Sequence, residues 1–270
     1  MTSPIYWSPH GGDAVRDWSV EQLVAAVAAA GYAGIEAQVA EKWVYWQDTA
    51  EVARLRALLD RYHLECPAVC WRGNQGDRLF TDPKCYATAK QYLNDCVDVA
   101  AALGARAVLV WPHIAEGVGR PEALAAAVRV FNDVADLCRA RDVVLAVEFE
   151  SKGNPLCGTP AETLELIAHT GNFVTACCDT IYLYNRRLDP YASVLPLRGK
   201  VGLVHLSDSD RLVPGDGAFD FPPFIQAIRE IRYAGPIFVQ IDPRMAEDLA
   251  HAYQRAVELT APLGWAITNT

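Results

Sequence analysis

The feature that most constrains the fold of this chain is an alternation of short apolar runs with longer amphipathic stretches, repeated eight times. Each run has the length of a strand, and the stretch after it carries helix signals, such as Ser19 before the first helix and Gly31 after it. The pattern predicts strands over 3–8, 33–38, 65–71, 106–111, 143–149, 173–178, 201–204 and 236–241. It predicts helices over 19–30, 49–62, 82–103, 121–141, 160–169, 190–197, 222–232 and 245–259.

Near-continuous apolar strands that alternate with helices are typical of a parallel sheet covered by helices. Eight such units in 270 residues favour a closed (β/α)8 TIM barrel over an open doubly wound sheet. No GxGxxG motif follows the first strand, which argues against dinucleotide binding. Because no linker or low-complexity segment interrupts the alternation, we expect a single domain over residues 1–270.

Composition excludes several classes of partner. The formal charge of −9 argues against nucleic acid, because binding phosphates requires clustered Lys and Arg. No apolar window reaches the length of a membrane span, and the N-terminus lacks a basic start followed by an apolar core. We therefore expect no membrane partner and a cytoplasmic protein. The eight cysteines form no CxxC pair and fall mostly within strand and helix patterns, so we expect reduced core thiols.

In a barrel of this kind, functional groups lie at the C-terminal ends of the strands. Polar and aromatic residues do gather there in this chain. Those at or just beyond a predicted strand end are Trp7, His10, Glu36, Gln38, Arg72, Trp111, His113, Glu148, Glu150, Asp179, His205, Gln240 and Asp242. The tryptophans at strand ends and in the second loop could wall a pocket and stack on a sugar, although barrel rims are amphipathic in any case.

Three consecutive strands, the fifth to the seventh, end in Glu148, Asp179 and His205. These side chains should therefore converge on one side of the barrel mouth. Two carboxylates and an imidazole suit a divalent cation such as Mn²⁺, Mg²⁺ or Co²⁺. Taken singly, each residue has a structural alternative: a carboxylate that caps the next helix, or a hydrogen-bonded core histidine.

These residues lie in the segments LAVEFE, CCDTIYLY and HLSDSDRLVPGDGAFDF. Over essentially the whole chain, the sequence resembles the sugar phosphate isomerase/epimerase superfamily of xylose isomerase-like barrels. That group includes ketose 3-epimerases, hydroxypyruvate isomerase-like proteins, inosose dehydratases and dehydroshikimate dehydratases. The resemblance implies one divalent metal ion, Mn²⁺ first and Mg²⁺, Co²⁺ or Zn²⁺ as alternatives. Its implied ligands are Glu148, Asp179, His205 and Gln240.

The resemblance also implies contacts with a small sugar or polyol substrate, and a homodimer or homotetramer. The arginine of the seventh-strand loop in such enzymes touches substrate oxygens, which corresponds to Arg211. We expect further substrate contacts from Asp208 in the same loop and from strand-end residues. The latter are Trp7, His10, Arg72 and Trp111.

Two positions depart from the superfamily pattern. Gln240 stands where these proteins usually have Glu, and Tyr182 replaces a frequent His. A glutamine carbonyl can still bind a cation, but it cannot act as a base. Of the two glutamates that exchange protons in two-base epimerases, Glu148 remains. This favours a one-base isomerase or a dehydratase, unless His113 or Glu150 supplies the second proton carrier.

The chemistry implied is proton abstraction next to a carbonyl through a metal-stabilised enediolate. The first hypothesis is a metal-dependent isomerase or epimerase of a ketose or keto-polyol, with Glu148, His113 and Glu150 as catalytic residues. The second is a dehydratase (lyase) of a cyclic keto-polyol, of the inosose or dehydroshikimate type. The third is a non-catalytic sugar-binding subunit. An apurinic endonuclease fits poorly, because such enzymes need a histidine-rich three-metal site and a basic face.

Overall fold

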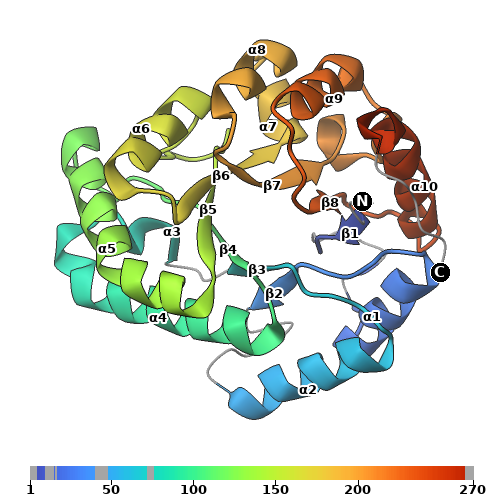
Figure 1. The fold of residues 1–270 in the computed structure, drawn as a ribbon, viewed down its shortest axis with the longest axis horizontal. Coiled ribbons are helices and arrows are strands. Elements are labelled where there is room, and N and C mark those ends of the chain that lie inside the picture. Colours follow the sequence, from blue (N-terminus) through green and yellow to red (C-terminus); the bar gives the residue numbers. More distant parts are fainter. Residues whose placement is uncertain (1–4, 10–14, 16, 40–47, 72–75, 265–270) are drawn as a thin grey trace.

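The computed structural model describes residues 5–9, 15, 17–39, 48–71 and 76–264. Its strands form one eight-stranded parallel sheet in the order β1-β8-β7-β6-β5-β4-β3-β2, surrounded by helices (Figure 1). The strands are β1 (Ile5–Trp7), β2 (Ala37–Val39), β3 (Ala68–Trp71), β4 (Ala107–Val110), β5 (Val144–Glu148), β6 (Val174–Asp179), β7 (Val201–Leu206) and β8 (Ile237–Val239).

The two ends of this strand order, β1 and β2, meet through main-chain hydrogen bonds. The amide of Trp7 donates to the carbonyl of Gly34 at 2.9 Å, and the amide of Glu36 donates to the carbonyl of Trp7 at 2.7 Å. Trp7 also forms a parallel bridge with Ile35. The sheet is therefore closed, and the prediction of a (β/α)8 TIM barrel is confirmed.

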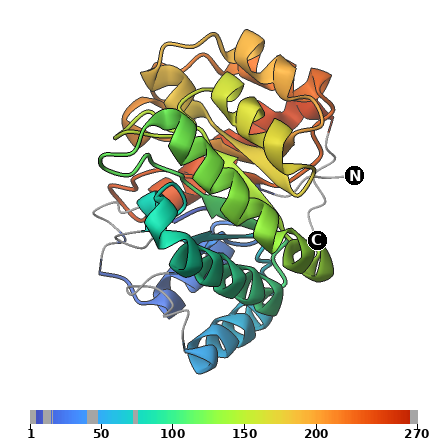
Figure 2. The same cartoon turned by 90° about the vertical axis from the view of Figure 1, so that its left-hand side faces the viewer.

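The helices form the outer ring, and Figure 2 shows α4 and α5 side by side along one flank. The longer helices are α1 (Val20–Ala29), α2 (Thr49–Arg61), α4 (Tyr86–Leu103), α5 (Arg120–Arg141), α6 (Pro160–Thr170), α9 (Phe221–Glu230) and α10 (Asp248–Thr260). Local signals act as predicted at α1, where Ser19 and Gln22 form a capping box. None of the described helices combines the length and apolarity that crossing a membrane requires.

Several boundaries differ from the prediction. The helix expected from 82 begins as a 3-10 turn, Pro83–Cys85, before α4. The helix expected over 190–197 is α8 (Pro190–Val194) followed by a 3-10 turn, Leu195–Leu197. The last helix starts at Asp248, whose carboxylate accepts from the amides of Arg244 and Met245 in the preceding turn.

Two short helices, α3 (Gly76–Leu79) and α7 (Thr180–Asn185), were not predicted, because four to six residues are too few to show a helical period. The strand expected over 33–38 is β2 at 37–39, preceded by single bridges at Gly34 and Ile35. The seventh strand runs on to Leu206, since His205 and Leu206 pair with β8. The single domain over 1–270 stays a prediction.

The core has two layers, one on each face of the sheet. A small cluster fills the barrel, and it includes Tyr6, Leu109, Cys177 and Phe238. A much larger cluster lies between strands and helices, and it includes Cys178. The adjacent Cys177 and Cys178 thus face opposite sides of β6, as period-two alternation predicts.

The bridge between Gly34 and Glu65 gives a first testable prediction, because a Cβ atom at Gly34 would overlap the main-chain carbonyl of Glu65. Gly34→Ala should lower the free energy of unfolding by about 1–3 kcal/mol, because the backbone must move apart. Urea denaturation measures this loss. The control is Gly119→Ala, where the nearest atom to a new Cβ is Pro121 Cδ at 3.9 Å. Equal stabilities of the two variants would contradict the close approach at Gly34.

A second prediction concerns the eight cysteines, all of which are reduced thiols. Seven are buried, and burial raises the pKa of Cys66 to about 12 and that of Cys138 to about 11. At pH 8, a chromogenic disulfide reagent should therefore react with no more than one thiol, that of the partly exposed Cys85, and only slowly, because burial and Asp82 raise its pKa. Cys85→Ser should abolish this reaction, and denaturation should release the rest. Rapid labelling of several thiols in the native protein would contradict the packing described.

Candidate active site

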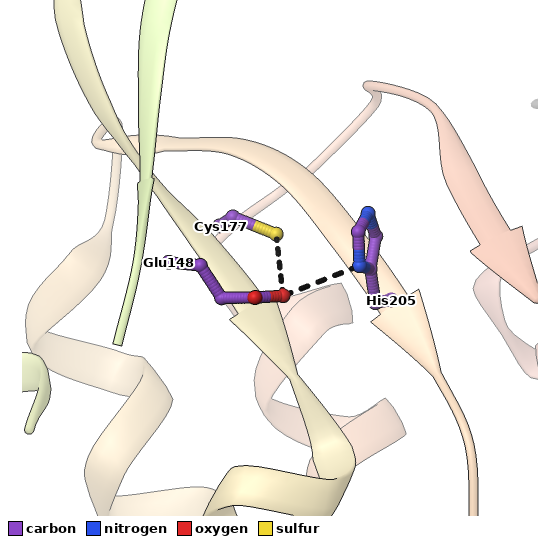
Figure 3. A group of neighbouring side chains, drawn as sticks. All are labelled: Glu148, Cys177 and His205. Atoms are coloured by element: carbon purple, nitrogen blue, oxygen red, sulfur yellow. Dashed lines mark hydrogen bonds and ion pairs between the residues drawn. The ribbon is translucent and has the colours of Figure 1, made fainter. Parts of the chain in front are cut away.

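The centre of the site is a group of three buried side chains from adjacent strands (Figure 3). Glu148 ends β5, and its register partner Cys177 lies in β6. Glu148 Oε1 lies 3.3 Å from Nδ1 of His205, in β7, and accepts from Cys177 Sγ at 3.7 Å. One ligand atom from each residue lies within 4.8 Å of the others, so these three side chains could hold a metal ion.

Burial and neighbouring charges shift the pKa values of Glu148 and His205. Burial raises the pKa of Glu148 above the ordinary carboxyl value, although His205 and Arg211 act to lower it. Burial alone would lower the pKa of His205, but Cys177, Glu36 and Glu148 outweigh it, and the pKa lies well above the usual imidazole value. The site therefore favours a positive charge next to Glu148, supplied by a proton or by a cation.

A second carboxylate faces the other nitrogen of the same histidine. Glu36 lies between the bridge residue Ile35 and the start of β2, is fully buried, and places Oε1 3.4 Å from His205 Nε2. Its Oε2 accepts from Ser8 Oγ at 2.5 Å, and Ser8 Oγ accepts from Gln240 Nε2 at 2.8 Å. Sequence reasoning placed Glu36 at a strand end but gave it no role. The sequence signal that could have given Glu36 a role is a carboxylate within an otherwise apolar strand.

Asp179 lies at the end of β6, fully buried, and pairs with Arg211 instead of with His205. Arg211 Nη1 donates to Asp179 Oδ2 at 2.6 Å, while Asp179 Oδ1 accepts from the amide of Ile181 and from Ser207 Oγ. Asp179 is thus also the N-cap of α7, which is the structural alternative considered for it. Arg211 Nη1 reaches the main-chain carbonyl of Gln240 at 3.4 Å as well.

The loop after β7 turns Arg211 back towards the strand ends. Asp210 and Arg211 both adopt left-handed φ values, 54° and 57°, which is strained backbone for residues other than glycine. Asp208 organises this loop: its Oδ1 accepts from the amides of Ser209 and Phe219, and its Oδ2 from Gly215. Both oxygens of Asp208, an expected substrate contact, are thus engaged by main-chain donors.

His113 and Glu150 form a second polar pair, 2.5 Å apart between Nε2 and Oε2, and the side chain of each is 16% exposed. The loops that carry them are joined by an antiparallel bridge between His113 and Pro155. Glu150 Oε1 accepts from Tyr182 OH at 3.4 Å, and Tyr182 OH accepts from Arg211 Nη2 at 3.3 Å. The pair is therefore linked to the Arg211–Asp179 contact.

The aromatic residues expected at the mouth divide into two groups. Trp111 Nε1 donates to Glu148 Oε2, so this side chain does lie against the central group. Trp7 is fully buried in the helix-facing core, where its ring lies 5.6 Å from that of Tyr32, and it does not join the group. The remaining expected positions lie outside the described residues, or have undescribed side chains: His10, Trp43, Trp46, Trp71 and Arg72.

The structure thus brings Glu148 and His205 into contact. Arg211 joins two further predicted residues, because it donates to the carboxylate of Asp179 and to the main-chain carbonyl of Gln240. It adds Glu36, Ser8 and Cys177, to which sequence reasoning gave no role. Three histidines outside this group, which fall in or beside helices, are exposed on the surface: His63, His169 and His251.

Comparisons with known proteins agree with this architecture. The chain is 27% identical over 261 residues to the L-ribulose 3-epimerase of Methylomonas sp. (strain DH-1), covering 89% of this chain and 88% of that protein. The crystal structure of a D-allulose 3-epimerase from Methylomonas sp. in complex with D-allulose superposes with a TM-score of 0.80 at 22% identity, covering 95% and 96% of the two chains. The IOLI protein with a bound zinc atom superposes with a TM-score of 0.80 at 16% identity, covering 98% and 100%.

A family profile described as "Xylose isomerase-like TIM barrel" matches residues 24–262. The match covers most of the chain, including every residue of the central group. It confirms the resemblance found in the sequence. The chain belongs to the xylose isomerase-like TIM barrel family.

Proposed function

We propose that this protein is a divalent-metal-dependent epimerase or isomerase of a ketose or keto-polyol, most simply a ketose 3-epimerase. The observation that carries the proposal is the contact of 3.3 Å between Glu148 and His205, a buried carboxylate and an imidazole at the C-terminal ends of barrel strands. The sugar 3-epimerases among its relatives support the choice of substrate class.

The residues at the site fit a divalent cation. Both ring nitrogens of the buried His205 and Oε1 of Glu36 lack hydrogen bonds among the described residues, although carboxylate oxygens lie 3.3–3.4 Å from the ring. Glu148 and His205 would hold the ion, with Asp179 and the carbonyl oxygen of Gln240 as further ligands. When bound, the ion would polarise the substrate carbonyl and stabilise the negative charge that forms on its oxygen.

The choice of metal follows from which atoms bind it. Carboxylate, amide and imidazole ligands suit Mn²⁺, Mg²⁺ or Co²⁺, whereas participation of Cys177 would favour Zn²⁺. In the structure, the Cys177 thiol donates to Glu148, and burial raises its pKa. These features support the oxygen-rich set.

Glu148 would remove the proton from the carbon next to the substrate carbonyl, which leaves an enediolate. Trp111, which donates to Glu148 Oε2, would hold the carboxylate in place. Arg211 would bind substrate oxygens, and Asp208 would serve by fixing the loop that carries it.

Epimerisation also requires a proton donor on the opposite face of the substrate, and Gln240 cannot supply one. We propose His113 for this step, with Glu150 orienting the imidazole at 2.5 Å. The link through Tyr182 to Arg211 supports a position next to the bound substrate.

A third prediction tests proton abstraction. In D₂O with saturating Mn²⁺, a panel of ketoses and keto-cyclitols should exchange a C–H proton in the presence of the protein, followed by NMR. Glu148→Gln should slow this exchange by at least ~100-fold, because the amide cannot accept the proton. The matched control is Glu65→Gln, in which the substituted carboxylate binds Tyr6.

The products of the same experiment separate the alternatives. An epimer or isomer supports the proposal, whereas loss of water from a keto-cyclitol would assign a dehydratase. Sugar binding without any deuterium exchange would contradict the catalytic proposal and favour an accessory binding subunit.

A fourth prediction separates the two proton transfers. His113→Asn should retain metal-dependent deuterium exchange but form epimer about 100-fold more slowly, because general acid–base groups contribute on this scale. His251→Asn, on the exposed face of α10, is the control. If His113→Asn slows exchange and epimer formation equally, His113 does not supply the second proton.

A further inference from the structure

The polar chain that runs from Gln240 to His205 has a defined direction. A carboxylate only accepts hydrogen bonds, so the Ser8 hydroxyl must donate its single proton to Glu36 Oε2, 2.5 Å away. Ser8 Oγ must then accept from its other neighbour, which requires Gln240 to present its amide nitrogen, 2.8 Å away. The carbonyl oxygen is thereby the one ligand atom that Gln240 retains.

The same argument identifies which oxygen of Glu36 can accept a hydrogen bond from His205. With Oε2 occupied by Ser8, Oε1 is the oxygen that faces the imidazole, 3.4 Å from Nε2. Glu36 Oε1 is buried and has no hydrogen-bond partner among the described residues. An acceptor held at this place is satisfied only if Nε2 carries a proton, which leaves Nδ1 as the nitrogen with a free lone pair.

The two nitrogens of His205 therefore have different roles. Nδ1 lies 3.3 Å from Glu148 Oε1, within the group that could hold a metal ion, while Nε2 points away from Glu148 (Figure 3). Histidines that bind metals commonly donate their other N–H to a carboxylate, which fixes the tautomer and strengthens the ligand.

We infer that Glu36 is a positioning residue for the metal site: with Ser8 and Gln240 it holds His205 in the tautomer whose Nδ1 binds the ion. The inference rests on the proposed metal-dependent function. It also accounts for the glutamine at 240. A glutamate there would compete with Glu36 for the one proton of Ser8 and would place a second carboxylate next to it.

The fifth prediction is that Glu36→Gln weakens binding of Mn²⁺ and of Zn²⁺ by about 10- to 100-fold, because the uncharged amide is a poorer acceptor for Nε2–H. Isothermal titration calorimetry with each metal alone, in competition with a chelator, measures the dissociation constants. Ser8→Ala, which leaves the carboxylate in place but unanchored, should give a smaller loss. Glu65→Gln, with the same change of charge on a surface carboxylate, should bind metal as the wild type does.

A spectroscopic measurement distinguishes positioning from a general loss of structure. In the Zn²⁺-loaded wild type, NMR should show a protected Nε2–H signal from His205, assigned by its absence in His205→Asn. In Glu36→Gln this signal should shift and exchange faster, while the circular dichroism spectrum stays that of the wild type.

The outcomes separate this inference from the function on which it rests. Unchanged metal affinity and an unchanged His205 signal in Glu36→Gln would overturn the role of Glu36 alone. A wild-type protein that binds no divalent ion would overturn the metal-dependent function, and this inference with it.

Discussion

The site depends on closure of the sheet between β1 and β2. The hydrogen bonds of Trp7 with Gly34 and Glu36 join the segment before β2 to β1, which itself pairs with β8. Closure brings Glu36 against Ser8 and His205, while the pairing of β1 with β8 places Ser8 next to Gln240. On the other side of the same segment, Gly34 permits the close approach of the chain before β3, because a side chain would overlap the backbone of Glu65.

Strand position was predictable because each strand is a continuous apolar run, and residues at its end had to lie at one edge of the barrel. This reasoning located Glu148, Asp179 and His205 at the ends of β5, β6 and β7. It could not state what each end residue contacts. Trp7 shows the reason: a shift of one residue turns a side chain from the barrel interior to the helices, and the strand end alone does not give that register.

Contacts between distant loops were beyond the reach of the sequence pattern. The pairing of Asp179 with Arg211 comes with two consecutive left-handed residues, Asp210 and Arg211, and although Asp adopts this conformation more often than most residues, two in succession are not predictable from local propensity. The strain is sustained by Asp208, whose carboxylate gathers three amides of the loop. The motif around His205 signalled a functional loop, and both Arg211 and Asp208 were expected to contact substrate, but the motif did not reveal that Asp208 holds the loop together.

Charge balance connects Gln240 to the rest of the site. Glu36, Glu148 and Asp179 are buried carboxylates, and Arg211 compensates one of them. A divalent ion bound with a neutral His205 would compensate the other two, so the buried cluster would carry no net charge. A glutamate at 240 would add a further buried negative charge, which is costly where water is excluded. The neutral amide thus suits a site in which Glu36 already supplies a carboxylate next to the histidine.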